Sequence, residues 1–137
     1  MIDQKMMELL KRENTGFNLE LGIEFVEIRK DYARTEILIG SKHLNPQGIV
    51  HGGCTFSLMD ATGGVAALMQ GYYVSTASSD IHYLNPAANT QKLIGEANVI
   101  KNGKNLLVYD VEARDQDHTL IAKATFTYFR LEKKVWE

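Results

Sequence analysis

The chain has 137 residues, of which 45% are hydrophobic and 23% charged. This length suits one domain, so we expect a single globular domain over residues 1–137 rather than a disordered chain. The net charge of −2 offers no broadly basic surface, which excludes the usual way of binding nucleic acid. No uninterrupted apolar stretch approaches the roughly 20 residues of a membrane-spanning helix, so we expect no membrane partner either.

Cys54 is the single cysteine, so no internal disulfide can form. Asp3 precedes any apolar run, unlike the basic start of a secretory signal. Both features favour a reducing, cytoplasmic location. The four histidines, at positions 43, 51, 82 and 118, have no ligand-like spacing with one another or with Cys54, and we therefore predict no metal site. Since Cys54 has no paired histidine, we expect it to pack rather than to act as a nucleophile.

The first forty residues predict a short helix followed by a β-hairpin. Apolar residues at helical spacing predict a helix over residues 2–11, which Gly16 and the polar turn around it should end. Alternating apolar residues then predict two strands, 21–28 and 32–39. The register of the first strand is open around residues 25–26.

A long apolar helix is the centre of the predicted fold. Residues 40–50 have no periodicity and should form a loop, after which a helix runs from Gly52 to about Gln70 with Gly71 as its stop. Four further strands should form an antiparallel meander, over residues 74–84, 91–101, 106–114 and 120–131. Residues 133–137 look like an ordinary charged tail. Because the helix is apolar all round, we predict an α+β fold in which an antiparallel sheet of about six strands wraps around it.

Asp60 is the one charged residue of this helix. A carboxylate is rarely buried without a partner, so Asp60 either reaches the surface, bonds a neighbouring turn or performs chemistry. Gly52 and Gly53 leave main-chain N–H groups accessible at the positive end of the helix dipole. An N–H there is suited to stabilise the oxygen of a polarised thioester carbonyl, as in an oxyanion hole. The glycines would equally permit a tight turn.

Three segments resemble the hot-dog-fold acyl-CoA thioesterases of the 4-hydroxybenzoyl-CoA thioesterase superfamily, in particular the branch similar to the phenylacetate-pathway thioesterase. They are Asn45-x-x-Gly48-x-x-His51-Gly52-Gly53 followed by Asp60, then Asp80-Ile81-His82-Tyr83-Leu84-Asn85-Pro86-Ala87, and Lys101-Asn102-Gly103-Lys104. The resemblance covers most of the chain from Asn45 onward. It implies the hot-dog fold and the hydrolysis of an acyl-CoA to a free acid and coenzyme A. Most relatives have an uncharged residue at the position of Asp80.

The resemblance also implies roles for individual residues. Asp60 would be the nucleophile or the general base, and the Gly52 N–H the oxyanion donor. Asn45 would orient the water or contact the thioester, Thr76 would position the attacking water, and His51 would order the loop. The further candidates for substrate contact are Gly53, Lys101, Gly103, Lys104 and Tyr83. Lys101 and Lys104 would meet the phosphates of coenzyme A, unless they are solvated hairpin charges. No cofactor is expected, because coenzyme A is part of the substrate.

The spacing of Gly52 and Asp60 predicts a site shared by two chains. Eight positions along a helix span about 12 Å, which is too far for both groups to act on one thioester. A two-fold dimer with antiparallel helices would set Gly52 of one subunit opposite Asp60 of the other. The resembled family is built in this way, and homotetramers are common in it. Gly63 and Gly64 would then mark a close approach of a second helix or a ligand, or only a packing bend.

Two other functions are open at this point. Hydration or dehydration of acyl thioesters would need an acid/base pair such as histidine with a carboxylate, and the sequence has no matching signature. A non-catalytic acyl-CoA sensor would have the same fold but no need of Asp60. The sequence does not identify the acyl group, nor does it separate direct attack by Asp60 from general-base catalysis.

Overall fold

A computed structural model describes residues 4–136. Its elements are α1 (Gln4–Glu13), α2 (Gly16–Leu21), β1 (Glu24–Arg29), β2 (Tyr32–Leu38), the 3₁₀ turn η1 (Ser41–His43), α3 (Gly52–Leu68), β3 (Tyr72–Tyr83), β4 (Lys92–Asn102), β5 (Leu106–Asp115) and β6 (Leu120–Lys134). Three residues used in the predictions, Ile2, Asp3 and Glu137, lie outside the described residues. No helix within residues 4–136 is long and apolar enough to span a membrane.

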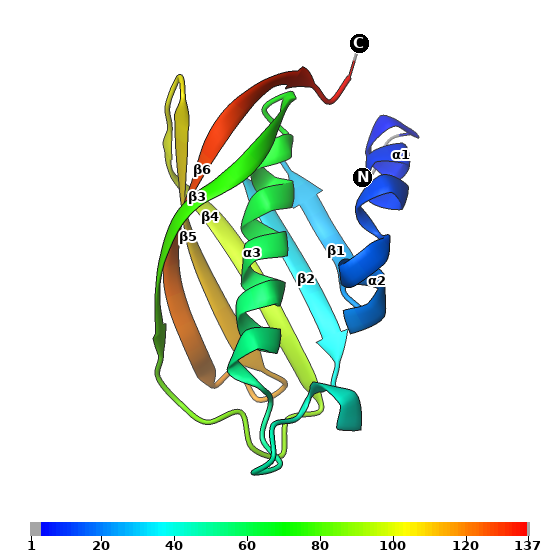
Figure 1. Cartoon of the computed structure of the whole chain (residues 1–137), viewed down its shortest axis with the longest axis vertical. Helices are drawn as coiled ribbons and strands as arrows, with labels where there is room; N and C mark the ends of the chain where they lie inside the picture. Colours follow the sequence, from blue (N-terminus) through cyan, green and yellow to red (C-terminus); the bar gives the residue numbers. More distant parts are fainter. Residues whose placement is uncertain (1–3, 137) are drawn as a thin grey trace.

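The six strands form one antiparallel sheet that curves around α3, while α1 and α2 lie beside β1 (Figure 1). The predicted α+β fold, a sheet wrapped around one long helix, is therefore confirmed. Leu58, Met59 and Val65 of α3 are at most 1% exposed and fill the space inside the curve of the sheet. Burial of apolar side chains of this size is the main stabilising contribution in such a core.

The strand order is β1-β2-β4-β5-β6-β3. The predicted meander of the last four strands is wrong in one respect, because β3 pairs with β6 and β4 pairs with β2. Alternation in a sequence identifies a strand and its two faces but not its neighbour. After α3 the chain enters the sheet at its far edge, and residues 84–91 then carry it back to the side of β2 (Figure 1). As a result, β3 is an edge strand.

The stop of α3 lies at Gly71, as predicted. Its φ of 109° belongs to the left-handed region that favours glycine, and its N–H donates to the Leu68 carbonyl at 2.9 Å. The helix itself ends at Leu68, two residues before the expected Gln70.

The first hairpin forms close to its predicted position. Asp31 makes its turn with a φ of 64°, and the pairing of β1 with β2 shifts by a bulge between Phe25 and Glu27. The bulge explains why alternation left the register open at this point. β1 begins at Glu24 rather than at the expected Leu21.

Residues 16–21 were expected to form a turn and the start of a strand, but they form the short helix α2. Gly22 ends this helix with a φ of 78°. His43 Nδ1 accepts from the Gly40 N–H at 2.9 Å, so its Nε2 carries the proton and donates to the Leu21 carbonyl at 2.7 Å. The hydrogen bond between His43 and Leu21 fixes the end of α2. No local pattern in the sequence indicates this bond, because the two residues are far apart in the chain.

The predicted charged tail is also wrong, because β6 continues to Lys134. Val135 is 6% exposed and packs with Leu9 of α1 and Leu68 of α3. Its N–H donates to the Gly71 carbonyl at 2.9 Å. The end of the chain therefore holds α1 against the end of α3.

Candidate active site

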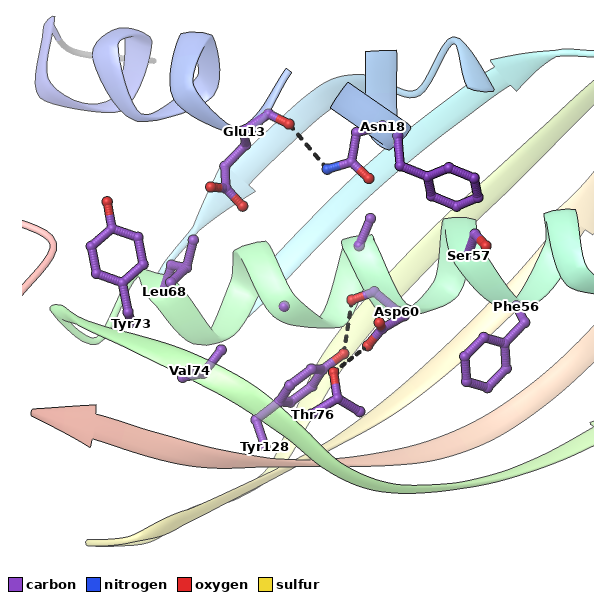
Figure 2. Close-up of a pocket in the computed structure, with 13 residues that line it drawn as sticks. Glu13, Asn18, Phe56, Ser57, Asp60, Leu68, Tyr73, Val74, Thr76 and Tyr128 are labelled. Atoms are coloured by element: carbon purple, nitrogen blue, oxygen red, sulfur yellow. Dashed lines mark hydrogen bonds between the residues drawn. The ribbon is translucent and has the colours of Figure 1, made fainter. Parts of the chain in front are cut away.

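Asp60 lies on the side of α3 that meets β3, in a hollow of about 400 Å³. Its carboxylate Oδ1 accepts a hydrogen bond of 2.7 Å from the Thr76 hydroxyl, and its main-chain carbonyl accepts one of 2.9 Å from the Tyr128 hydroxyl (Figure 2). Asp60 is half-buried. The other lining residues come from α1, α2, α3 and β3: Glu13, Phe17, Asn18, Phe56, Ser57, Ala61, Gly64, Leu68, Tyr73 and Val74. The carboxylate thus has a partner on the neighbouring strand and also borders a space that can hold a ligand.

The Tyr128 ring explains one of the two interior glycines. A Cβ at Gly63 would lie 2.3 Å from the Tyr128 hydroxyl oxygen, so no larger residue fits without a shift. Gly63 therefore allows close packing within the chain. A Cβ at Gly64 would meet nothing nearer than 3.8 Å, and Gly64 lines the Asp60 hollow. Burial, followed by the charge of Asp60, raises the pKa of Tyr128, which keeps its hydroxyl a donor.

The beginning of α3 leaves one main-chain donor free. His51 caps the helix: its Nδ1 accepts from the Gly53 N–H at 2.8 Å, and its carbonyl accepts from the N–H groups of Cys54 and Thr55. The Gly52 N–H has no acceptor within residues 4–136. Gly52, rather than the other predicted residue Gly53, therefore has the N–H that a ligand can use.

Asn45 and Tyr83 lie with Gly52 around a second hollow of about 300 Å³. The Asn45 side-chain oxygen accepts from the N–H groups of Gln47 and Ile49 at 2.9 and 3.2 Å, so its amide nitrogen is the part left for a ligand. The Tyr83 hydroxyl donates to the Gly52 carbonyl at 2.9 Å, and burial raises the pKa of Tyr83. Three of the predicted site residues thus meet at the start of α3.

The two hollows share no lining residue. One holds Asn45, Gly52 and Tyr83, and the other holds Asp60 and Thr76. Gly52 and Asp60 are separated along α3 by about 12 Å, at 1.5 Å per residue. Within one chain, the predicted oxyanion donor and the predicted carboxylate are therefore not brought together.

The hairpin between β4 and β5 carries the remaining candidates. The Gly103 N–H donates to the Leu106 carbonyl at 3.0 Å, and a Cβ at Gly103 would lie 2.5 Å from that oxygen, so the turn itself requires glycine. Lys101 and Lys104 are exposed and line neither hollow. The tip of the hairpin lies at the opposite end of the molecule from the start of α3 (Figure 1). The chain by itself does not bring these lysines to Gly52.

Two further predictions, and the unusual residue Asp80, concern positions outside these two hollows. Cys54 is buried, and burial raises the pKa of its thiol to about 11, which fits a packing role. Asp80 is 81% exposed at its side chain and lies 3.7 Å from His82. No three histidine, cysteine or acidic side chains gather as a metal site would require in the part of the chain that the structure describes.

Most residues of the Asp60 hollow were missed by sequence reasoning, and among them are Glu13 and Tyr128. Tyr128 follows the inward alternation of β6, which predicts a core position but not a contact with Asp60. Glu13 is the last residue of α1, two positions beyond the helix predicted for residues 2–11, and no sequence motif includes it. Burial raises the pKa of Glu13, and the charge of the neighbouring Arg12 lowers it by a smaller amount, so the pKa lies above its usual value.

Comparison with known proteins relates this geometry to a family. Residues 47–122 match the family model of the thioesterase superfamily. The chain is 37% identical over 123 residues to a Saccharolobus solfataricus protein that carries the name of an esterase, with 88% of this chain and 80% of that one covered. It is 29% identical over 110 residues to acyl-coenzyme A thioesterase PaaI of Escherichia coli, with coverage of 80% and 79%.

Two solved structures share the fold. The PaaI protein of E. coli matches with a TM-score of 0.88 at 25% identity, over 98% of this chain and 99% of that chain. A Streptococcus mutans protein solved with bound acetyl-CoA, smu.793, matches with a TM-score of 0.77 at 30% identity, over 81% and 90%. Fold and family together define a thioester hydrolase with the hot-dog fold. The chain belongs to the thioesterase superfamily, in its PaaI-like branch, as the sequence motifs predicted.

Proposed function

We propose that the protein hydrolyses an acyl-CoA thioester to a free acid and coenzyme A, at active sites shared between the subunits of a homodimer. The observation that carries the proposal is the Asp60 carboxylate, held by Thr76 beside a hollow of about 400 Å³. The E. coli relative named an acyl-coenzyme A thioesterase and the S. mutans structure with acetyl-CoA support this class of substrate.

Asp60 in its ionised form drives the reaction. Either its oxygen attacks the thioester carbonyl carbon, or it removes a proton from a water molecule that attacks there. Thr76 orients the carboxylate through the hydrogen bond that it donates. In both routes the C–S bond breaks, the sulfur leaves with a proton as the coenzyme A thiol, and water supplies the hydroxyl of the free acid. No cofactor or metal takes part in these steps.

The negative charge that develops on the carbonyl oxygen needs donors aimed at it. The Gly52 N–H is suited to this role because it lies at the start of α3 and has no acceptor in residues 4–136. The Asn45 amide nitrogen is a second donor beside the same hollow. His51 acts indirectly, since it occupies the Gly53 N–H and leaves that of Gly52 to the substrate.

The separation of Gly52 and Asp60 supports a shared site. In a two-fold dimer with antiparallel α3 helices, Gly52 of one subunit meets Asp60 of its partner. β3 supports this pairing, because it is an edge strand of 12 residues whose outer edge pairs with no strand within residues 4–136. Exposed edges of this length are normally covered. Two such dimers would form the homotetramer that is common in the resembled family. The location that we propose for the protein is the reducing cytoplasm.

The same arrangement gives Lys101 and Lys104 a role. Their hairpin lies at the end of the molecule where α3 ends (Figure 1). Antiparallel helices would therefore place this hairpin at the same end as the partner's Gly52. Lys101 and Lys104 would then meet the phosphates of a coenzyme A whose thioester lies between the two subunits.

A thiol-release assay over short, medium, long and aryl acyl-CoAs tests the proposal. Native protein should release coenzyme A from at least one of them, and Asp60→Asn should lose nearly all of this rate while keeping the native unfolding temperature. Full activity of Asp60→Asn would contradict the mechanism. Tight acyl-CoA binding without turnover by the native protein would instead favour the sensor function.

A further inference from the structure

The Asp60 hollow is a groove that follows one side of α3. Ser57, Ala61, Gly64 and Leu68 line it at the helical spacing of residues on one face. The floor is low at Ala61 and Gly64 because both residues are small. Glu13, Phe17 and Asn18 of the α1–α2 corner form one wall, and Tyr73, Val74 and Thr76 of β3 form the other.

Glu13 and Asp60 lie toward opposite ends of this groove. Figure 2 shows Asp60 toward Phe56, and the Glu13 side chain toward Leu68 and Tyr73. Asp60 and Leu68 are eight residues apart on α3, or about 12 Å. An extended carbon chain zigzags, so each bond of about 1.5 Å advances it by only about 1.3 Å, and the length corresponds to roughly nine carbon–carbon bonds. An acyl group that reacts at Asp60 and extends along the groove would end at Glu13.

The Glu13 carboxyl has no hydrogen bond and no ion pair within residues 4–136, although it is half-buried. Its main-chain carbonyl is fixed by the Asn18 amide, which donates at 3.0 Å (Figure 2). Arg12 does not pair with it, because its guanidinium donates to the Tyr73 hydroxyl at 2.9 Å and to the Val135 carbonyl at 3.4 Å. A partly desolvated acceptor without a donor is unfavourable, and a bound ligand that brings a donor removes this penalty.

We propose that Glu13 is a specificity-determining residue that accepts a hydrogen bond from a hydroxyl group at the far end of a medium-length acyl chain. This inference rests on the proposed thioester hydrolysis at Asp60. The negative charge of Glu13 disfavours a carboxylate at the chain end, and the positive charge of Arg12 beside it weakens the attraction of Glu13 for an ammonium group. A methyl end would leave the Glu13 carboxyl desolvated and unpaired.

Matched substrates test the assignment: decanoyl-CoA, 10-hydroxydecanoyl-CoA, 10-aminodecanoyl-CoA and the CoA thioester of decanedioic acid. Native protein should show a kcat/KM for the hydroxylated chain at least about tenfold above that for each of the others. Glu13→Met should reduce the hydroxyl-to-methyl ratio to about one or below. Glu8→Met removes an exposed carboxylate of α1 outside the groove and should keep the native ratio.

Two measurements separate recognition from folding. Thermal unfolding of Glu13→Met should match that of native protein, because the Glu13 carboxyl has no protein partner to lose. Gly64→Leu fills the groove and should slow hydrolysis of both ten-carbon chains more than that of acetyl-CoA. If native protein hydrolyses the four chains at equal kcat/KM, or prefers the amino or carboxylate end, hydrolysis stands and the role of Glu13 is refuted. If it hydrolyses no acyl-CoA, the proposed function fails and the substrate assignment fails with it.

Discussion

Replacing Gly52 by proline would remove a single hydrogen-bond donor from the proposed site. Gly52 is the first residue of α3, where proline is well tolerated because the missing N–H makes no bond within the helix. His51 has φ −60° and ψ 135°, the extended conformation that a residue before proline adopts. A Cβ at Gly52 would approach the Tyr83 ring no closer than 3.4 Å, an ordinary contact. We therefore expect Gly52→Pro to fold normally.

The expected effect on catalysis is large. Loss of one oxyanion donor lowers kcat by about 10²–10³-fold, or about 3–4 kcal/mol of transition-state stabilisation. Gly52→Ala is the matched control, because it adds the same Cβ beside Tyr83 and keeps the N–H. We expect Gly52→Ala to retain kcat within a few-fold of native protein, in the same thiol-release assay and at a similar unfolding temperature.

Mixing two inactive variants tests whether the site is shared. In a mixed dimer of Gly52→Pro with Asp60→Asn, one site combines the native Gly52 of one chain with the native Asp60 of the other, and the second site has neither. Random exchange at equal amounts makes half of the dimers mixed, so about a quarter of the native specific activity should return. Native mass spectrometry on the same sample reports the fraction of mixed dimers.

Two results would refute this reasoning. Native-like kcat in Gly52→Pro would exclude the Gly52 N–H as the oxyanion donor. If mass spectrometry detects mixed dimers and the mixture stays inactive, Gly52 and Asp60 do not act across the interface. An active monomer would lead to the same conclusion.

Two further predictions concern stability. Gly63→Ala should destabilise the protein by about 1–3 kcal/mol, because its Cβ would meet the Tyr128 hydroxyl oxygen at 2.3 Å. In a double-mutant cycle, adding Tyr128→Phe should restore part of this loss. Strict additivity of the two substitutions would contradict the packing argument. The Lys123 hydrogen bond lowers the pKa of Glu112, so its stabilisation is present above the unfolded-state pKa of about 4.3 and is lost as pH falls through the lower folded-state pKa. Lys123→Met should therefore lower the free energy of unfolding at pH 7 by at most about 1 kcal/mol for this partly exposed pair, and the difference from native protein should shrink below about pH 4.

The sequence determined the elements whose causes are local. Apolar periodicity and Gly71 located α3, and alternating residues located the six strands within a few positions. The motif around Asn45 and Asp60 also identified the family, because spacing along the chain is enough to recognise it. The functional roles of its residues stay predictions.

Only the tertiary structure decided which segments meet. The edge position of β3, the burial of Val135 and the end of α2 at Leu21 depend on contacts between residues far apart in the chain. The same holds for the site, where His51 occupies the Gly53 N–H and leaves that of Gly52 free. Hydrogen-bond pairing and burial are properties of the packed chain. The sequence pattern therefore identified Gly52 and Gly53 as a pair, but it did not show which of the two has the free N–H.

Glu13 shows the same limit most clearly. By sequence it is a charged residue just after the helix predicted for residues 2–11, where solvent is the usual neighbour. The fold places Glu13 on the groove that also holds Asp60, and the Asn18 amide of α2 holds the Glu13 carbonyl of α1 there. The sequence thus determined the class of enzyme, while the packing of α1 and α2 decided what lies at the far end of its groove.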